Sequence, residues 1–126
     1  MFKIILLISL GGAFGAPLRY ILNLSVNNIF KYSFPTGTLV VNILGSFAMG
    51  ILAMSLKNYH YFNEDIIKYF FMIGFLGSFT TFSSFSIEVV NMIESHNYFY
   101  AILYILLSLL LNVLAALAGF NYLRLF

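Results

Sequence analysis

The sequence contains no cysteine and has very few charged residues. Its 126 residues include 0 Cys and only 8% charged side chains, with a formal net charge of +2. Without cysteine there is no disulfide framework and no thiolate chemistry. A soluble domain usually has about a quarter charged residues, so a mostly water-facing surface is excluded. A charge of +2 without a basic run gives no indication of nucleic-acid binding.

Residue patterns typical of enzymes are also lacking. Two His and four acidic residues are spread along the chain and form no clustered metal-ligand motif. No nucleophile–base pair and no phosphate-binding loop is visible. We therefore expect that the protein is not an enzyme.

Apolar residues are present in excess and make up 62% of the chain. A membrane helix needs about 20 predominantly apolar residues, and four stretches are long enough. The predicted spans are 3–30, 37–57, 66–94 and 98–123. We expect an all-α membrane protein, with a single four-helix transmembrane domain over 1–126 that lies as a multi-pass protein in the lipid bilayer of the cell membrane.

The first residues also fit a second interpretation. A basic start, an apolar run and small residues near Ala16 are typical of a cleavable signal peptide. However, the apolar pattern continues beyond Ala16 to Leu24 and more weakly to Phe30. No composition typical of a mature soluble domain follows, so we expect the stretch to be a membrane span.

The stretch Gly74–Glu88, GFLGSFTTFSSFSIE, is unusual for a membrane span. Its two glycines loosen a helix, and Ser78, Thr80 or Thr81 could cap a restart. A break frees backbone groups, which is tolerated at membrane depth only where protein or a cavity satisfies them. Several transport proteins build ion sites from helices broken at the midplane. We therefore predict that the third helix is broken near mid-membrane.

Aromatic rings and hydroxyl groups alternate after the predicted break. Phe79, Phe82 and Phe85 recur every three residues, and Ser83 and Ser86 share the same broad face. A chain with 15 Phe would supply such rings for core packing alone. Because an aromatic ring has a positive edge, ring edges and hydroxyl donors could also face an anion without holding it tightly.

The second stretch has one small and polar face. At about 100° per residue, this face contains Asn42, Gly45, Ser46, Met49, Gly50 and Ala53. Asn42 is its only strongly polar side chain at depth. Its amide either bonds a neighbouring helix, which is worth about 1 kcal/mol, or donates to a passing anion. The segment leaves both interpretations open.

The fourth stretch carries a stripe of hydrogen-bonding side chains on an otherwise apolar helix. Tyr104, Ser108 and Asn112 are four residues apart and therefore share one face. Bonding between helices and an interfacial tyrosine would explain the stripe without an ion. A ladder of donors along an anion path is the functional alternative.

Two charged residues lie well inside the predicted spans. A guanidinium in a membrane segment usually faces protein, a cavity or the interface. Arg19 either reaches the lipid headgroups or sets a positive potential at the mouth of an anion path. Burial disfavours a charged carboxyl group, so we expect Glu88 to be protonated or paired with a hydroxyl or with Arg19. With mostly donors at depth, the pattern favours a small anion over a cation.

Taken together, the motifs resemble the CrcB/Fluc family of fluoride channels. The resemblance covers essentially the whole chain and rests on GxxGAPxRY near the start, PTGTLVVNILGSFxxG in the second stretch, GxxGSFTTFSSF in the third and the ladder in the fourth. It implies an antiparallel, dual-topology homodimer with two pores that exports fluoride passively and so lowers cytoplasmic fluoride.

The resemblance also implies roles for individual residues. The fluoride pathway would comprise Asn42, Phe82, Phe85, Ser83, Tyr104, Ser108 and Asn112, with Arg19 at the pore mouth. The backbone carbonyls of Gly77 and Thr80 would hold a structural sodium ion at the dimer interface. The chain departs from the family pattern at Asn112, where a serine or threonine is expected, and at the Ser78–Phe79 pair.

The distribution of basic residues is in tension with dual topology. The predicted side that carries both termini has four basic residues, and the other side has Lys31, with Arg19 unassigned; the four are Lys3, Lys57, Lys68 and Arg124. The positive-inside rule would place the termini in the cytoplasm. Lys57 and Lys68 lie near helix ends, which weakens this count, and we keep the expectation of dual topology.

Two other functions are compatible with a small four-helix membrane protein. The first is a proton-coupled multidrug antiporter that uses Glu88 as its membrane carboxylate. In that protein Glu88→Gln should abolish cation transport, whereas a fluoride channel should keep most of its efflux. The second is a non-transporting assembly subunit, for which the purified protein alone would carry no ion flux.

Overall fold

A computed structural model describes residues 1–30, 34–58 and 63–122. The described residues form helices and contain no strand. Lys31, Arg124 and the predicted end of the fourth span at 123 lie outside them. Helices long and apolar enough to cross a membrane cover four spans, Phe2–Ile29, Thr36–Lys57, Ile66–Glu94 and Tyr98–Tyr122. The prediction of an all-α protein with four transmembrane helices is confirmed.

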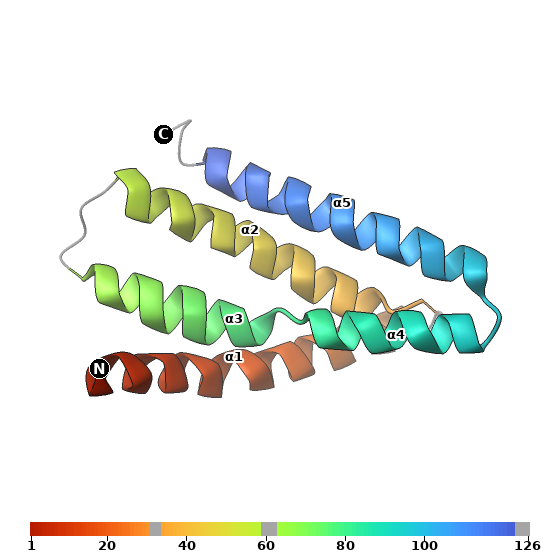
Figure 1. Ribbon diagram of the computed structural model, residues 1–126, viewed down its shortest axis with the longest axis horizontal. Coiled ribbons are helices and arrows are strands. Elements are labelled where there is room, and N and C mark those ends of the chain that lie inside the picture. The colour runs from red at the N-terminus through yellow and green to blue at the C-terminus, as the bar shows by residue number, and fades with distance from the viewer. Residues whose placement is uncertain (31–33, 59–62, 123–126) are drawn as a thin grey trace.

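The four spans are built from six helical elements. These are α1 (Phe2–Ile29), α2 (Thr36–Asn58), the π-helix η1 (Ile66–Leu76), α3 (Gly77–Phe79), α4 (Phe82–Glu94) and α5 (Tyr98–Tyr122). Figure 1 shows α2 beside α5, and α1 beside η1 and α3. The start of α1 and the end of α5 lie at the same end of the molecule. The third span consists of η1, α3 and α4 in succession.

Glycines allow the neighbouring helices to pack with their backbones in contact. A Cβ atom at Gly11 or Gly15 would overlap the backbone of η1 at Phe70 or Phe75. A Cβ atom at Gly119 of α5 would similarly overlap the Phe47 carbonyl of α2. Small residues at such positions allow close helix association in membranes. The backbones of α1 and η1, and those of α2 and α5, therefore pack close together.

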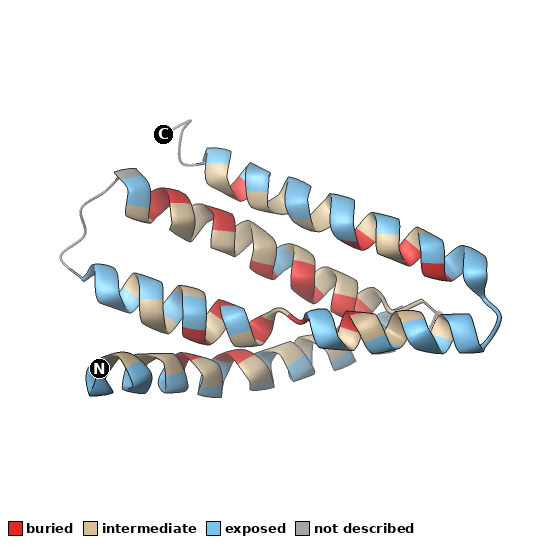
Figure 2. Cartoon of the chain, viewed as in Figure 1, coloured by how far each residue is buried: buried red, intermediate tan, exposed pale blue. Residues whose placement is uncertain are grey.

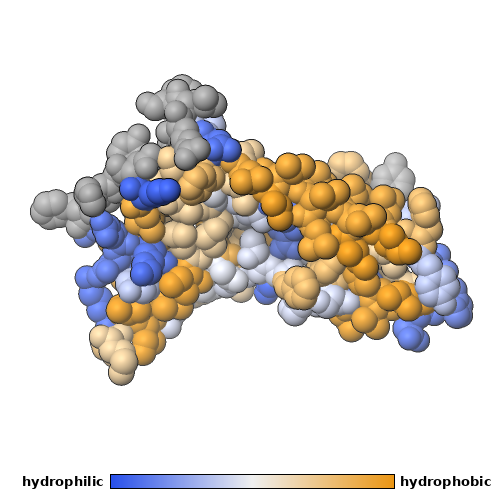
Figure 3. Space-filling view, turned by 45° about the horizontal axis from the view of Figure 1, so that its top comes forward, coloured by the Kyte–Doolittle hydropathy of each residue, from blue (hydrophilic) through white to orange (hydrophobic). Residues whose placement is uncertain are grey.

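The outer faces of the helices are exposed and apolar. Figure 2 shows exposed residues along the outer sides of α1 and α5 and buried residues between the helices. Large side chains such as Phe14, Leu110 and Val113 are 63%, 60% and 59% exposed. In the view of Figure 3, apolar surface covers much of the middle of the molecule and hydrophilic residues lie at both ends. This distribution suits contact with lipid.

The third span is interrupted between α3 and α4. Thr80 has a ψ of 155°, and Thr81 has φ and ψ of −149° and 122°, so both have extended backbone. Thr81 is the N-cap of α4, because its Oγ1 accepts the backbone N–H of Ser84 at 3.1 Å. This bond satisfies one of the free N–H groups that open a helix.

Candidate functional site

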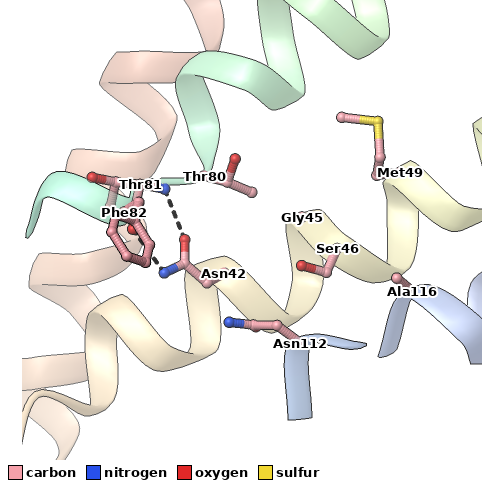
Figure 4. Close-up of a pocket in the computed structure, with 9 residues that line it drawn as sticks. All are labelled: Asn42, Gly45, Ser46, Met49, Thr80, Thr81, Phe82, Asn112 and Ala116. Carbon is pink, nitrogen blue, oxygen red and sulfur yellow. Dashed lines mark hydrogen bonds between the residues drawn. The ribbon is translucent and has the colours of Figure 1, made fainter. Parts of the chain in front are cut away.

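A groove lies beside the interruption of the third span. It has a volume of about 320 Å³ and is lined by side chains from α2, α5 and the interruption, namely Asn42, Gly45, Ser46, Met49, Thr80, Thr81, Phe82, Asn112 and Ala116. Figure 4 shows the Asn42 amide directed at the Thr81 backbone, with Ser46 and Asn112 on the neighbouring parts of α2 and α5. The groove therefore brings together three of the predicted pathway residues, Asn42, Phe82 and Asn112.

Asn42 holds the interruption in place. Its Nδ2 donates to the Thr81 carbonyl at 2.9 Å, and its Oδ1 accepts the Thr81 N–H at 2.8 Å. One side chain of α2 thus satisfies both backbone groups of a residue outside any helix. An asparagine amide carries two N–H donors, so the second stays available to the groove. The two interpretations of Asn42, a bond between helices and a donor to an anion, are therefore compatible.

The same bonds leave two backbone carbonyls without their usual donors. In a continuous helix the Gly77 carbonyl would accept from the Thr81 N–H, and the Thr80 carbonyl from the Ser84 N–H. The Thr81 N–H instead binds Asn42, and the Ser84 N–H binds Thr81 Oγ1. Carbonyl oxygens freed in this way are suitable ligands for a hard cation. Backbone carbonyls at Gly77 and Thr80 are oxygen ligands of the type that the predicted sodium ion would need, and the sodium site itself stays a prediction.

Three aromatic rings lead from the groove into the protein. The Phe82 and Phe85 ring centroids are 5.3 Å apart, and those of Phe85 and Tyr104 are 5.1 Å apart. Phe82 is 74% exposed, whereas Phe85 and Tyr104 are 8% and 0% exposed. The predicted ring pair is thus in contact, but one of its members lies on the surface of the single chain.

Glu88 accepts hydrogen bonds from two hydroxyl groups. Thr38 Oγ1 donates to its Oε1 at 2.6 Å, and the Tyr104 hydroxyl donates to its Oε2 at 2.7 Å. Of the partners considered for Glu88, the structure has hydroxyls rather than Arg19. The Tyr104 hydroxyl hydrogen is consequently directed at the carboxylate, and the Tyr104 ring is the part that contacts Phe85.

Two polar atoms of the fourth-span stripe are buried without a partner. Ser108 Oγ and Asn112 Oδ1 have no hydrogen bond within the described part of the chain. Leaving a buried polar group unsatisfied costs about 1–3 kcal/mol. Such atoms often mark the place of a water molecule or an ion. Both atoms are thus candidates for contact with a hydrated or transported ion.

The remaining predicted residues lie around this centre. Ser83 is exposed, and its hydroxyl lies 3.2 Å from Thr81 Oγ1, next to the groove. Gly77 is exposed on the surface of the single chain. Arg19 is partly exposed on α1 and is not among the residues that line the groove.

Thr38 is a site residue that the sequence did not single out, and Thr81, which was considered only as a helix cap, has a second role in the site. Thr38 is fully buried and bonds Glu88, and Thr81 carries the backbone groups that Asn42 binds. Thr38 precedes Asn42 by four residues and so lies on the same face of α2. Extending the polar face of the second stretch back by one turn would have found it.

Comparison with known proteins agrees with these features. The family model described as CrcB-like protein, Camphor Resistance (CrcB), matches residues 6–120. A protein of Francisella tularensis subsp. mediasiatica is 40% identical over 93% of this chain and 92% of its own length. A protein of Azobacteroides pseudotrichonymphae is 43% identical over 95% of this chain and 95% of its own length. A protein of Campylobacter jejuni is 41% identical over 95% of this chain and 97% of its own length.

All three relatives are named "Fluoride-specific ion channel FluC". A match over nearly the whole chain, together with identities of 40% or more to these three, establishes the family. With its four apolar spans, this chain is a multi-pass membrane protein that belongs to the CrcB-like family.

Proposed function

We propose that this chain is a fluoride-selective channel of the cell membrane, through which fluoride leaves the cytoplasm passively. The observation that carries the proposal is the groove, where the Asn42 and Asn112 amides and the Phe82 ring meet at a break in a membrane helix. The names of the relatives support fluoride as the ion. They give no support to the multidrug antiporter that would use Glu88.

In this proposal fluoride passes through the groove and along the rings. The free N–H of Asn42 and the Asn112 amide replace part of the hydration shell. The positive edges of Phe82 and Phe85 then carry the ion toward Tyr104 and Ser108, with Ser83 at the side of the groove. A narrow, donor-lined route favours the smaller halide, because selectivity depends on pore size and donor placement. Arg19 would raise the positive potential at the mouth.

The path is proposed to be completed by a second, antiparallel copy of the chain. Phe82 is 74% exposed, and Gly77 is exposed as well. A transported anion cannot run along a surface in contact with lipid, because lipid offers no hydrogen-bond donor. A homodimer would cover these residues and supply the opposite wall of each pore.

The interruption is proposed to lie near the bilayer midplane and to bind sodium. It divides the 29-residue third span into η1 with α3, of 11 and 3 residues, and α4, of 13 residues. Since these parts are similar in length, the break falls near the middle of the span. The Gly77 and Thr80 carbonyls of both copies would then hold one structural sodium ion between them.

Flux measurements with the purified protein in liposomes test this function. An ionophore is added to dissipate the membrane potential that would otherwise stop net anion efflux. A fluoride electrode then records the efflux, and a chloride electrode serves as the control. We expect fast fluoride efflux without matching chloride efflux. If chloride leaves as fast as fluoride, the protein is not a selective fluoride channel, and if neither leaves, the assembly-subunit interpretation is favoured.

A further inference from the structure

A series of hydrogen bonds connects the end of α1 to Glu88 through the start of α2. Asn27 Nδ2 donates to Asn23 Oδ1 at 2.7 Å, and Asn23 Nδ2 donates to Thr38 Oγ1 at 2.9 Å. Thr38 Oγ1 then donates to Glu88 Oε1 at 2.6 Å. None of the residues that precede Glu88 in this series is part of the ion path proposed above.

The donation from Asn23 fixes the direction of the Thr38 hydroxyl. A threonine hydroxyl has one hydrogen and can accept through its oxygen. Because the Asn23 amide occupies an accepting position of Oγ1, the single hydrogen of Thr38 is left for Glu88. Without Asn23, this hydroxyl would be free to turn to a backbone carbonyl three or four residues earlier, at Pro35 or Phe34 just before α2, as threonines commonly do.

The first turn of α2 holds both asparagines in position. Asn27 Oδ1 accepts the Gly37 N–H at 2.9 Å and lies 3.4 Å from Thr36 Oγ1. A Cβ atom at Gly37 would lie 2.6 Å from Asn23 Oδ1 and 2.8 Å from Asn27 Oδ1. Both distances are shorter than real Cβ contacts, and the Asn23 backbone carbonyl oxygen would lie 2.6 Å away as well, so glycine at this position leaves room for the pair as it is placed. The Asn27 side chain of α1 thereby satisfies one of the free N–H groups at the start of α2.

We propose, on the basis of the channel function above, that Asn23 is a positioning residue of the ion path. It acts through Thr38 to keep the Thr38 hydroxyl on the Glu88 carboxylate, which also accepts from the Tyr104 hydroxyl. Hydrogen bonds to a carboxylate weaken the negative potential that it exerts on nearby groups, and they fix its orientation. Losing one donor would leave a less compensated negative charge beside Tyr104 and oppose the passage of an anion.

An infrared measurement tests the effect on Glu88 without any ion flux. The Glu88 carboxylate band is obtained as the difference between the infrared spectra of a protein with Glu88 and of the same protein with Glu88→Gln. We expect Asn23→Leu to shift this band in the same direction as Thr38→Val. Ser25→Ala is the matched control on α1, because among the described residues its hydroxyl bonds only the Ile21 carbonyl of the same helix, and it should leave the band in place.

Fluoride efflux from liposomes tests the effect on transport. We expect Asn23→Leu to slow efflux about fivefold, the effect of one net hydrogen bond, and Ser25→Ala to leave it unchanged. The double variant with Thr38→Val should be no slower than Thr38→Val alone, since coupled residues are not additive. If Asn23→Leu does not assemble, Asn23→Ala takes its place in both measurements.

The outcomes separate this inference from the proposed function. A Glu88 band that stays at its native position in the Asn23 variant overturns the positioning role. The role is also overturned if the double variant slows efflux by the product of the two single effects, because the two residues would then act independently. A native protein without fluoride efflux overturns the channel function instead, and the infrared band still reports whether Asn23 controls Glu88.

Discussion

Asn42 and Thr81 exchange two hydrogen bonds across the space between α2 and the interruption of the third span. The amide that faces the groove is therefore also the group that stabilises the wall of the groove. Asn42 is buried, and losing these bonds would leave both backbone groups of Thr81 without this partner. Structural and transport roles are consequently combined in one side chain, and its variants should change both.

The Asn42→Asp variant should lose both stability and flux. Aspartate keeps an acceptor for the Thr81 N–H but removes the donor to the Thr81 carbonyl. We expect a loss of about 1–3 kcal/mol in the free energy of unfolding and a fluoride efflux reduced by more than about tenfold, the factor that corresponds to 1.4 kcal/mol. Thermal unfolding in detergent and liposome efflux measure the two effects. Native efflux would contradict the role of the amide.

Phe82→Ile and Phe85→Ile should both cut fluoride flux but differ in stability. Both rings lie on the proposed path, and only Phe85 is buried, at 8% exposure compared with 74% for Phe82. We expect a loss of about 1 kcal/mol for Phe85→Ile, as for other changes of shape in a core, and a smaller loss for Phe82→Ile, because the fold of the single chain leaves this ring on its surface. Size-exclusion chromatography checks that the oligomeric state is unchanged. Unchanged flux in both variants would mean that the rings serve packing alone.

Ser108→Ala should reduce flux without reducing stability. Ser108 Oγ is buried and has no hydrogen-bond partner among the described residues. Removing an unsatisfied hydroxyl is therefore neutral or stabilising, by up to about 1 kcal/mol, whereas an ion that uses this donor loses it. Parallel thermal unfolding and efflux measurements provide the comparison. A less stable variant with native flux would show that the hydroxyl has a structural partner.

Gly15→Ala should destabilise the protein, and Gly12→Ala provides a matched control. A Cβ atom at Gly15 would overlap the Phe75 carbonyl and the Ser78 hydroxyl, while a Cβ atom at Gly12 has nothing within 4 Å. Overpacking of this kind typically costs about 1–3 kcal/mol. We expect a lower unfolding midpoint for Gly15→Ala only. Equal midpoints for the two variants would contradict the close contact of α1 with the third span.

Sodium should stabilise the folded protein if the freed carbonyls bind it. A ligand that binds only the folded state raises stability in proportion to the logarithm of its concentration once the site is saturated. The unfolding midpoint should therefore rise when sodium replaces N-methylglucamine at constant ionic strength. A midpoint that is equal in the two salts would count against a sodium site at Gly77 and Thr80.

The number of spans could be predicted from the sequence because it depends on local composition. An apolar run of sufficient length is visible without knowledge of its neighbours. The π-helical form of η1 was not predicted. Gly74 lies against Ile8 and Gly11 of α1, so the local conformation is formed in contact with a helix that is distant in sequence.

The candidate site was predictable in its residue types but not in its bonds. The stripe through Tyr104 and Ser108 follows from helical spacing, and both residues are buried as a stripe facing protein would be. However, the partner of Tyr104 is Glu88, and Glu88 also bonds Thr38, 50 positions earlier in the chain. Spacing within one helix carries no information on such pairs, which depend on how the helices are packed.

The interruption at Thr81 has a consequence for biosynthesis. Until Asn42 is in place, the Thr81 N–H and carbonyl would enter the bilayer without partners, which costs several kcal/mol for each group. The helix that supplies Asn42 is synthesised before the third span, so a partner for these groups is already in the membrane when Thr81 arrives. Moving this helix behind the third span by circular permutation should therefore impair membrane insertion even though all native contacts could still form.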